Sequence, residues 1–172
     1  MQKPTDLRSS WCDETEVDLS QLCPVTNENC VGMNFRVVKT VKVQDGQDFE
    51  LVCETIGNVV KARLVCNGLP VGYANLMLHD RIATLQDIKI CDDAPNPNWL
   101  IRLISPRWLT KNYRGNGLGT FLLSSICEYV RRAGIKKIVG TMVGDVDRLE
   151  DWYRKAGFVV DRQSNAISID FY

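Results

Sequence analysis

The sequence contains no apolar run that approaches a membrane-spanning helix, which takes about 18 residues. It also lacks an excess of charge, with 21 basic residues against 21 acidic ones and a single histidine. A balanced charge removes the long-range attraction that draws proteins to nucleic acid or to an anionic membrane. The start of the chain has no apolar stretch behind its positive charge. We therefore expect a cytoplasmic protein with neither nucleic acid nor a membrane as its partner.

Regularly spaced cysteine pairs are missing as well. The chain has 7 cysteines, an odd number, and none forms a Cys-x-x-Cys pair. A zinc site built from Cys12, Cys23, Cys30 and the only histidine, His79, would have separations that match no usual pair of ligands. We therefore expect reduced thiols and no metal.

The composition is that of one globular domain, with 172 residues, of which 45% are hydrophobic and 24% charged. Residues 1–33 differ from the rest because they are acidic and show little periodicity. We interpret them as an acidic N-terminal extension, either a solvated segment that packs loosely or one that shapes a binding cleft. Residues 34–172 then form the domain.

The first half of the domain is typical of β-strands. Branched and alternating residues occupy the runs 35–43, 49–55, 59–66, 70–78 and 83–90. Asn67-Gly68 predicts a two-residue hairpin turn. In the last run, strict alternation would place Leu85, Asp87 and Lys89 on one face of the strand and Gln86, Ile88 and Ile90 on the other.

The second half alternates strand and helix. Apolar residues recur at three and four positions over residues 118–133, which predicts a helix that ends at Gly134. A strand over 135–143 and a short helix follow, the helix opened by Asp145 or Asp147 and closed by Gly157. Runs 158–160 and 167–171 predict a closing hairpin. The whole pattern predicts a mixed α+β sheet.

A glycine-rich loop precedes the long predicted helix. Residues 114–120 read Arg-Gly-Asn-Gly-Leu-Gly-Thr, with three glycines at alternate positions. Such a turn leaves backbone N–H groups bare and lets an anion approach the positive end of a helix. It lacks the last glycine of the dinucleotide fingerprint and the Gly-Lys-Ser/Thr of a P-loop. It is thus either an anion-binding turn or a loop that only turns the chain.

This loop and the helix after it resemble the acyl-CoA pyrophosphate loop, Arg/Gln-x-x-Gly-x-Gly/Ala, of the GNAT superfamily of N-acetyltransferases. Residues 149–158 resemble the second signature of that family, in which a tyrosine precedes a Gly-Phe pair by four residues, and residues 83–90 resemble the strand that leads to the loop. The resemblance covers about residues 59–172. It implies a GNAT-like, mostly antiparallel sheet with a long helix after the glycine loop and a second helix near the C-terminus.

Three features depart from the family pattern. Residues 91–113 lie between the strand and the loop, and we interpret them as an insertion. The other register would make Trp108-Leu109-Thr110 the cofactor strand. Val146 stands where the family commonly has an asparagine, and Gln86 where many members have a glutamate.

The resemblance also implies roles for individual residues. Tyr153 would be the acid that protonates the leaving thiolate, the alternative being a core aromatic. Asp87 would act as a base through water, the alternative being a structural partner of a nearby arginine or lysine. A backbone N–H near Ile90 would stabilise the oxyanion. The predicted cofactor-binding residues are Ile88, Lys89, Ile90, Arg114, Gly115, Asn116, Gly117, Leu118, Gly119 and Thr120.

The function that follows is an acetyl-CoA-dependent N-acetyltransferase, with acetyl-CoA as co-substrate and no metal. It would act on the primary amine of a small molecule or a peptide by direct attack in a ternary complex. The alternative is an acyl-CoA-binding or protein-interaction module with weak or no turnover. Residues 42–59 show no helical stripe to wall an acceptor site, so we expect residues 1–33 and 91–113 to shape acceptor selection. A homodimer is compatible with the sequence, because dimers are the commonest oligomers.

Overall fold

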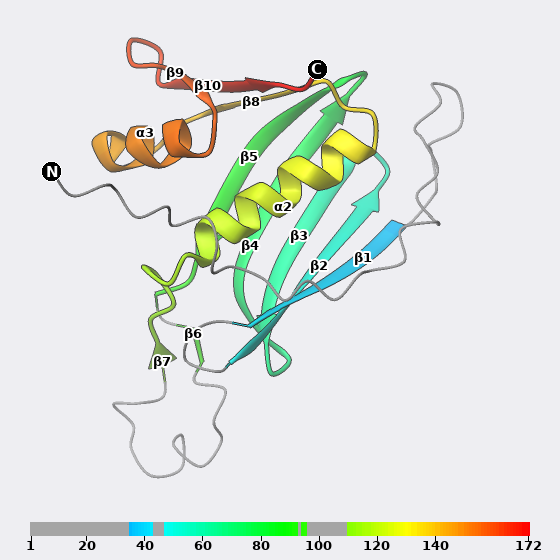
Figure 1. The fold of residues 1–172 in the computed structure, drawn as a ribbon, viewed down its shortest axis with the longest axis vertical. Coiled ribbons are helices and arrows are strands. Elements are labelled where there is room, and N and C mark those ends of the chain that lie inside the picture. The colour runs from blue at the N-terminus through cyan, green and yellow to red at the C-terminus, as the bar shows by residue number, and fades with distance from the viewer. Residues whose placement is uncertain (1–34, 43–46, 93, 96–109) are drawn as a thin grey trace, which may run out of the picture.

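The computed structural model describes residues 35–42, 47–92, 94–95 and 110–172, and a single main sheet forms its centre (Figure 1). The strands of this sheet are β1 (Phe35–Lys42), β2 (Asp48–Ile56), β3 (Val59–Cys66), β4 (Leu69–His79), β5 (Ile82–Ile90), β8 (Lys137–Thr141), β9 (Val159–Asp161) and β10 (Ala166–Asp170). They lie in the order β1-β2-β3-β4-β5-β8-β10-β9. Neighbouring strands are antiparallel except β5 and β8, which are parallel. The predicted mixed α+β class is confirmed.

Strands β1 to β5 form a meander whose turns follow from the sequence. Asn67 and Gly68 both have positive φ, 48° and 78°, which is what a two-residue turn between right-twisted strands requires. The register pairs Lys42 with Asp48, so only residues 43–47 join β1 to β2. Of the stretch 42–59, the structure describes Lys42 and residues 47–59, and these are mainly strand, as expected.

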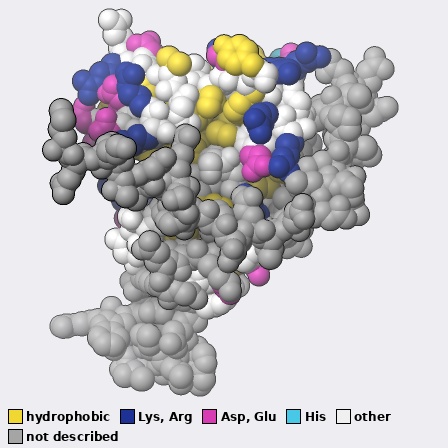
Figure 2. Space-filling view, in the orientation of Figure 1, with side chains coloured by type: hydrophobic (Ala, Val, Ile, Leu, Met, Phe, Trp, Pro, Cys, Tyr) yellow, Lys and Arg dark blue, Asp and Glu magenta, His cyan; other side chains and the backbone are white. Residues whose placement is uncertain are grey.

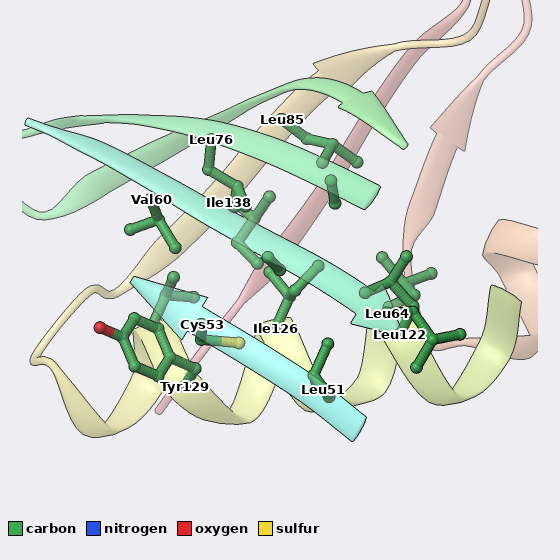
Figure 3. Packing of buried hydrophobic residues seen from close by; sticks show 14 of the residues in the cluster. Leu51, Cys53, Val60, Leu64, Leu76, Leu85, Leu122, Ile126, Tyr129 and Ile138 are labelled. Carbon is green, nitrogen blue, oxygen red and sulfur yellow. The ribbon is translucent and has the colours of Figure 1, made fainter. Parts of the chain in front are cut away.

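Helix α2 (Leu118–Arg132) crosses one face of β2 to β5 and is the crossover between the parallel strands β5 and β8 (Figure 1). Its apolar face meets side chains from the sheet (Figure 3). Burial of each large apolar side chain contributes about 1.5–3 kcal/mol. The buried residues of the helix are Leu118, Leu122, Leu123, Ser125, Ile126, Tyr129 and Val130. Beyond its end Gly134 adopts φ 84°, as a helix stop requires.

Helix α3 (Val146–Lys155) joins β8 to β9. Asp145 caps it by accepting a hydrogen bond from the backbone N–H of Arg148 at 3.3 Å, so Asp145 and not Asp147 opens the helix. Charged side chains gather over α3 in Figure 2, where Arg162 pairs with Asp147 and Glu150. Neither α2 nor α3, the helices of the described part of the chain, is long and apolar enough to cross a membrane.

A β-bulge changes the faces of β5. Leu85 pairs with Leu76 and Asp87 with Asn75, so Gln86 has no partner in β4. One extra residue moves every later side chain to the other face. The predicted grouping of Leu85 with Asp87 and Lys89 is therefore wrong: Ile88 and Ile90 join Leu85 in packing against the core, while Asp87 and Lys89 are exposed. Alternation alone cannot locate such a bulge, because the extra residue leaves the sequence pattern plausible in either register.

The two ends of the insertion lie side by side at the end of β5. Its ends pair as β6 (Ala94–Pro95) with β7 (Thr110–Lys111) in a separate two-stranded sheet. The backbone N–H of Cys91 bonds to Val71 O at 2.9 Å, and that of Tyr113 to Cys91 O at 3.3 Å. Since Thr110 lies outside the main sheet, the alternative register is wrong and β5 is the strand beside the loop. Residues 1–33, Trp108, Leu109 and the greater part of the insertion lie outside the described residues.

Candidate active site

The glycine loop presents an uncapped helix start. Gly115 and Gly117 have φ of 84° and 74°, a conformation that L side chains rarely adopt. Gly117 is the N-cap of α2, no side chain caps the helix, and the first turn contains no acidic residue. The first helical bond runs from Phe121 N–H to Gly117 O at 3.0 Å. The N–H groups from Leu118 to Thr120 are thus available to an anion, with the helix dipole behind them.

Arg114 ties this loop to the end of β5. Its Nε donates to Ile90 O at 3.4 Å and its guanidinium pairs with Asp92 at 3.2 Å. Tyr113, next to it, is fully buried and packs edge-on against Phe49 with ring centroids 5.8 Å apart. These contacts explain how the strand and the loop stay adjacent although residues 91–113 separate them in sequence.

A cleft of about 620 Å³ opens between the loop, the end of β5 and the start of α3. This volume suits a small-molecule ligand. The parallel pairing of β5 with β8 stops at Leu85, so the later part of β5 faces the cleft without β8 beside it. The cleft is lined by Ile88, Lys89, Ile90, Tyr113, Arg114, Gly115, Gly117, Gly119, Thr120, Val143, Gly144, Asp145, Arg148, Leu149 and Trp152.

Eight of the ten predicted cofactor-binding residues lie in this lining. The other two are Asn116, which is exposed outside it, and Leu118, whose side chain is buried in the core. Apart from Lys89, whose side chain lies on the opposite face of β5, the lining contains two basic residues, Arg114 and Arg148, and one acidic residue, Asp145. The excess of positive charge and the uncapped helix both favour an anionic ligand.

The sequence reasoning missed the far wall of the cleft. That wall is formed by Val143, Gly144, Asp145, Arg148, Leu149 and Trp152. Trp152 Nε1 donates to Thr120 Oγ1 at 3.1 Å. This bond joins α3 to the first turn of α2 across the cleft. The sequence signal that could have revealed this wall is Gly144-Asp145, which lies just before a helix, as the glycine-rich loop does. Val146, where the family has asparagine, is half-buried and brings no polar group.

Tyr153 lies behind the lining of the cleft. Its side chain is 4% exposed, and its ring packs against Trp152 and Phe158 with centroids 4.7 and 5.3 Å away. Burial, followed by the charges of Asp87 and Cys127, raises the pKa of Tyr153 to about 12. It is therefore a core aromatic by packing and is also within electrostatic reach of the other predicted catalytic residue.

Asp87 is exposed on the face of the sheet away from α2 and does not line the cleft. Its Oδ2 accepts a hydrogen bond from the Tyr73 hydroxyl at 2.7 Å. Among the described residues its partner is thus a tyrosine and not the arginine or lysine of the structural alternative. The bond and the charge of Asp87 raise the pKa of Tyr73, so Tyr73 remains a hydrogen-bond donor at neutral pH.

The described residues contain no cluster of three or more metal-ligating side chains. Cys12, Cys23 and Cys30 lie outside them. The cysteines that the structure describes, Cys53, Cys66, Cys91 and Cys127, are free thiols.

Comparison with known proteins identifies the class. Residues 64–158 match the acetyltransferase (GNAT) family, which is more than half of the chain, and the protein belongs to this family. No curated protein sequence gives a significant match. The family assignment therefore rests on the family match and on the fold.

Solved structures of other proteins align with this chain. The cAMP-binding acyltransferase of Mycobacterium smegmatis aligns with a TM-score of 0.55 at 14% identity, over 78% of this chain and 47% of that protein. The PaiA N-acetyltransferase of Thermoplasma acidophilum, solved with coenzyme A, aligns at 0.49 with 14% identity, over 66% of this chain and 62% of that one. The ribosomal-protein-S18-alanine N-acetyltransferase of Escherichia coli aligns at 0.48 with 15% identity, over 66% and 69%. The chain thus spans less than two thirds of the first two proteins.

Proposed function

We propose that this protein is an acetyl-CoA-dependent N-acetyltransferase that acts on a primary amine by direct attack in a ternary complex. The observation that carries the proposal is the uncapped start of α2, which opens into the 620 Å³ cleft where β5 runs on past its pairing with β8. Family membership supports acyl transfer in general.

The cleft residues fit an acyl-CoA. The N–H groups of the loop and first turn, with Arg114 and Arg148, would hold phosphates. At Ile88 to Ile90, the edge of β5 that has no described strand beside it would hydrogen-bond an extended amide-bearing arm as another strand would. When bound, acetyl-CoA supplies an activated acyl carbon.

The protein's residues then have to accept one proton and donate another. The incoming ammonium must lose one before its nitrogen can attack, and Asp87 is the candidate acceptor, through water. The C–N bond forms as the C–S bond breaks, and the nitrogen releases its second proton to water. The leaving thiolate takes a proton, for which Tyr153 is the candidate donor. With a Tyr153 pKa of about 12 and a thiol pKa of about 8.5, that transfer is uphill unless it accompanies C–S cleavage.

A module that binds acyl-CoA without efficient turnover is the second candidate. It is favoured by Gln86 and Val146, which cannot supply the glutamate and asparagine of the family pattern, and by the raised pKa of Tyr153. Both candidates require the cleft to bind CoA, and only the first requires acetyl transfer to an amine.

Thermal unfolding of the full chain with acetyl-CoA, free CoA or NAD tests the CoA site. A ligand at 100 times its Kd stabilises by about 2.7 kcal/mol, or roughly 5 to 10 °C for a chain of this size. We expect this shift with both CoA forms and none with NAD. The variant Gly119→Asp places a negative charge at the helix start, where it suits the dipole but repels phosphate, so it should lose the shift and keep its unliganded Tm.

Ser124→Asp is the matched control. It adds the same charge to α2 at an exposed position outside the cleft, and it should retain the full shift. An equal shift in Gly119→Asp would refute the loop as the phosphate site. If CoA binds, turnover with a panel of primary amines separates the enzyme from the binding module.

A further inference from the structure

Two neighbouring rows of side chains cross the face of the sheet opposite α2. The register aligns Arg63, Tyr73 and Lys89 across β3, β4 and β5, and Lys61, Asn75 and Asp87 in the next row. Ala74, between Tyr73 and Asn75, is fully buried on the α2 side, so both rows lie on the opposite face. Tyr73 reaches diagonally from one row to the other to bond Asp87, a span that suits an aromatic side chain.

The bulge at Gln86 is what brings Asp87 to this face. In an unbroken strand Asp87 would share the α2 face with Leu85, which is buried. Instead its carboxylate is exposed just past the point where β5 and β8 stop pairing. Tyr153 of α3 lies close enough for the Asp87 charge to affect it. The carboxylate therefore contacts a tyrosine from β4, and its charge acts on a tyrosine from α3.

The carboxylate is held on one side only. Asp87 has no hydrogen bond or ion pair with the described residues other than the bond that its Oδ2 accepts from Tyr73. Of the nearby cations, Arg63 is engaged with Glu54 at 3.0 Å. Lys89 follows Asp87 by two residues on β5, and Lys61 lies beyond Asn75 on β3; neither pairs with the Asp87 carboxylate. Oδ1 is left for a cation from outside the described chain.

We propose that Tyr73 is a positioning residue of the acceptor site, whose hydroxyl orients Asp87 so that the free carboxylate oxygen receives the ammonium group of a primary amine. The amine approaches from the sheet face opposite α2, while acyl-CoA occupies the cleft on the α2 side. This inference rests on the proposed function. It predicts acceptors that are cationic at neutral pH, since a neutral amide or hydroxyl would gain only a hydrogen bond from the carboxylate and no attraction between charges.

Steady-state kinetics of the full chain with the best amine of the panel test this role. Tyr73→Phe keeps the ring and removes the hydroxyl, so we expect the KM for the amine to rise about tenfold. The KM for acetyl-CoA and the Tm should stay unchanged, because Tyr73 lies outside the cleft and its hydroxyl bond is exposed. In an Asp87→Asn background the same change should have no further effect. Tyr172→Phe, at an exposed position, is the matched control.

Calorimetry of amine binding to the CoA-loaded protein tests the role of Tyr73 without the need for turnover. Weaker binding in Tyr73→Phe supports the inference. Equal binding in the two proteins overturns it, as does an effect of Tyr73→Phe that persists with Asp87→Asn. A wild type that binds CoA but no amine also overturns it, whereas a wild type that binds no CoA refutes the proposed function itself.

Discussion

Single residues in this protein take their chemistry from what surrounds them. Tyr153 stands in the tyrosine position of the family signature, yet burial raises its pKa to about 12. Such a phenol stays protonated at any pH in which the protein works, which an acid requires, but it gives up its proton reluctantly. The sequence around Tyr73 carries no signal of a role for it, because only the fold brings its hydroxyl to Asp87.

The acid role of Tyr153 predicts a specific kinetic result. Tyr153→Phe keeps the packing against Trp152 and Phe158, so Tm should change little. The kcat should fall tenfold or more with the KM for acetyl-CoA nearly unchanged. Because the pKa is about 12, ionisation of this tyrosine should cause no loss of kcat up to pH 10 in the wild type.

Tyr129→Phe is the control for that experiment. Tyr129 is also a buried tyrosine, and its hydroxyl is 2.7 Å from Thr55 Oγ1. Its loss should lower stability by about 1 kcal/mol and leave kcat unaltered. An unchanged kcat in Tyr153→Phe would reduce Tyr153 to a core aromatic.

At the scale of elements, the bulge at Gln86 in β5 and the glycine at position 72 in β4 determine where the site lies. The bulge at Gln86 separates the apolar side chains that line the cleft from the carboxylate on the other face. Opposite the end of β5, Gly72 pairs with Ile90. A Cβ at Gly72 would lie 2.6 Å from Ile90 Cδ1 and 3.0 Å from Lys89 O, closer than atoms pack. The end of the cofactor strand thus lies where it does because residue 72 has no side chain.

Gly72→Ala tests this dependence. The added methyl group must displace Ile90 and the backbone of Lys89, both of which line the cleft. We expect a loss of about 1–3 kcal/mol in unfolding free energy together with weaker CoA binding, measured by denaturation and calorimetry. Gly68→Ala is a control of the opposite kind, because a Cβ there meets no atom within 4 Å but the φ of 78° is strained. It should lower stability without changing the CoA affinity, and a Gly72→Ala protein with wild-type affinity would contradict the argument.

At the scale of the whole molecule, one core under α2 serves both stability and the site. It holds two thiols, Cys53 and Cys127, whose pKa values burial raises from 9.0 to about 12 and about 11. Burial in the core therefore disfavours the charged thiolate form of both cysteines. The stability of the protein should depend on pH as a result.

Stability should decline in alkali. Below pH 9 both thiols are protonated in the folded and unfolded chains, so they do not affect the balance. Above pH 9 the unfolded chain loses these protons while the folded chain keeps them up to about pH 11 to 12. The unfolding free energy should thus fall by about 1 kcal/mol per thiol at pH 10. Denaturation of the wild type and of Cys53→Ala/Cys127→Ala at pH 7, 9 and 10 measures this, and equal slopes for the two proteins would rule it out.

What the sequence determined by itself is local. The Asn67-Gly68 turn, the apolar stripe of α2, its stop at Gly134 and the glycines of the loop each depend on backbone preferences within a few residues, and each was predicted correctly. Most of the residues predicted to bind the cofactor also lie together in one cleft, because residues 114–120 and the end of β5 carry a recognisable pattern. The sequence could not show which face Asp87 occupies, because a bulge is set by cross-strand pairing and not by strand periodicity.

The tertiary structure decided everything that depends on contacts between distant segments. It closed residues 91–113 at their base, so that Ile90 and Arg114 meet. It added the far wall of the cleft from α3, and it placed the Tyr73 hydroxyl on Asp87. Such pairings depend on strand order and register, which many side chains fix together and no short stretch of sequence encodes.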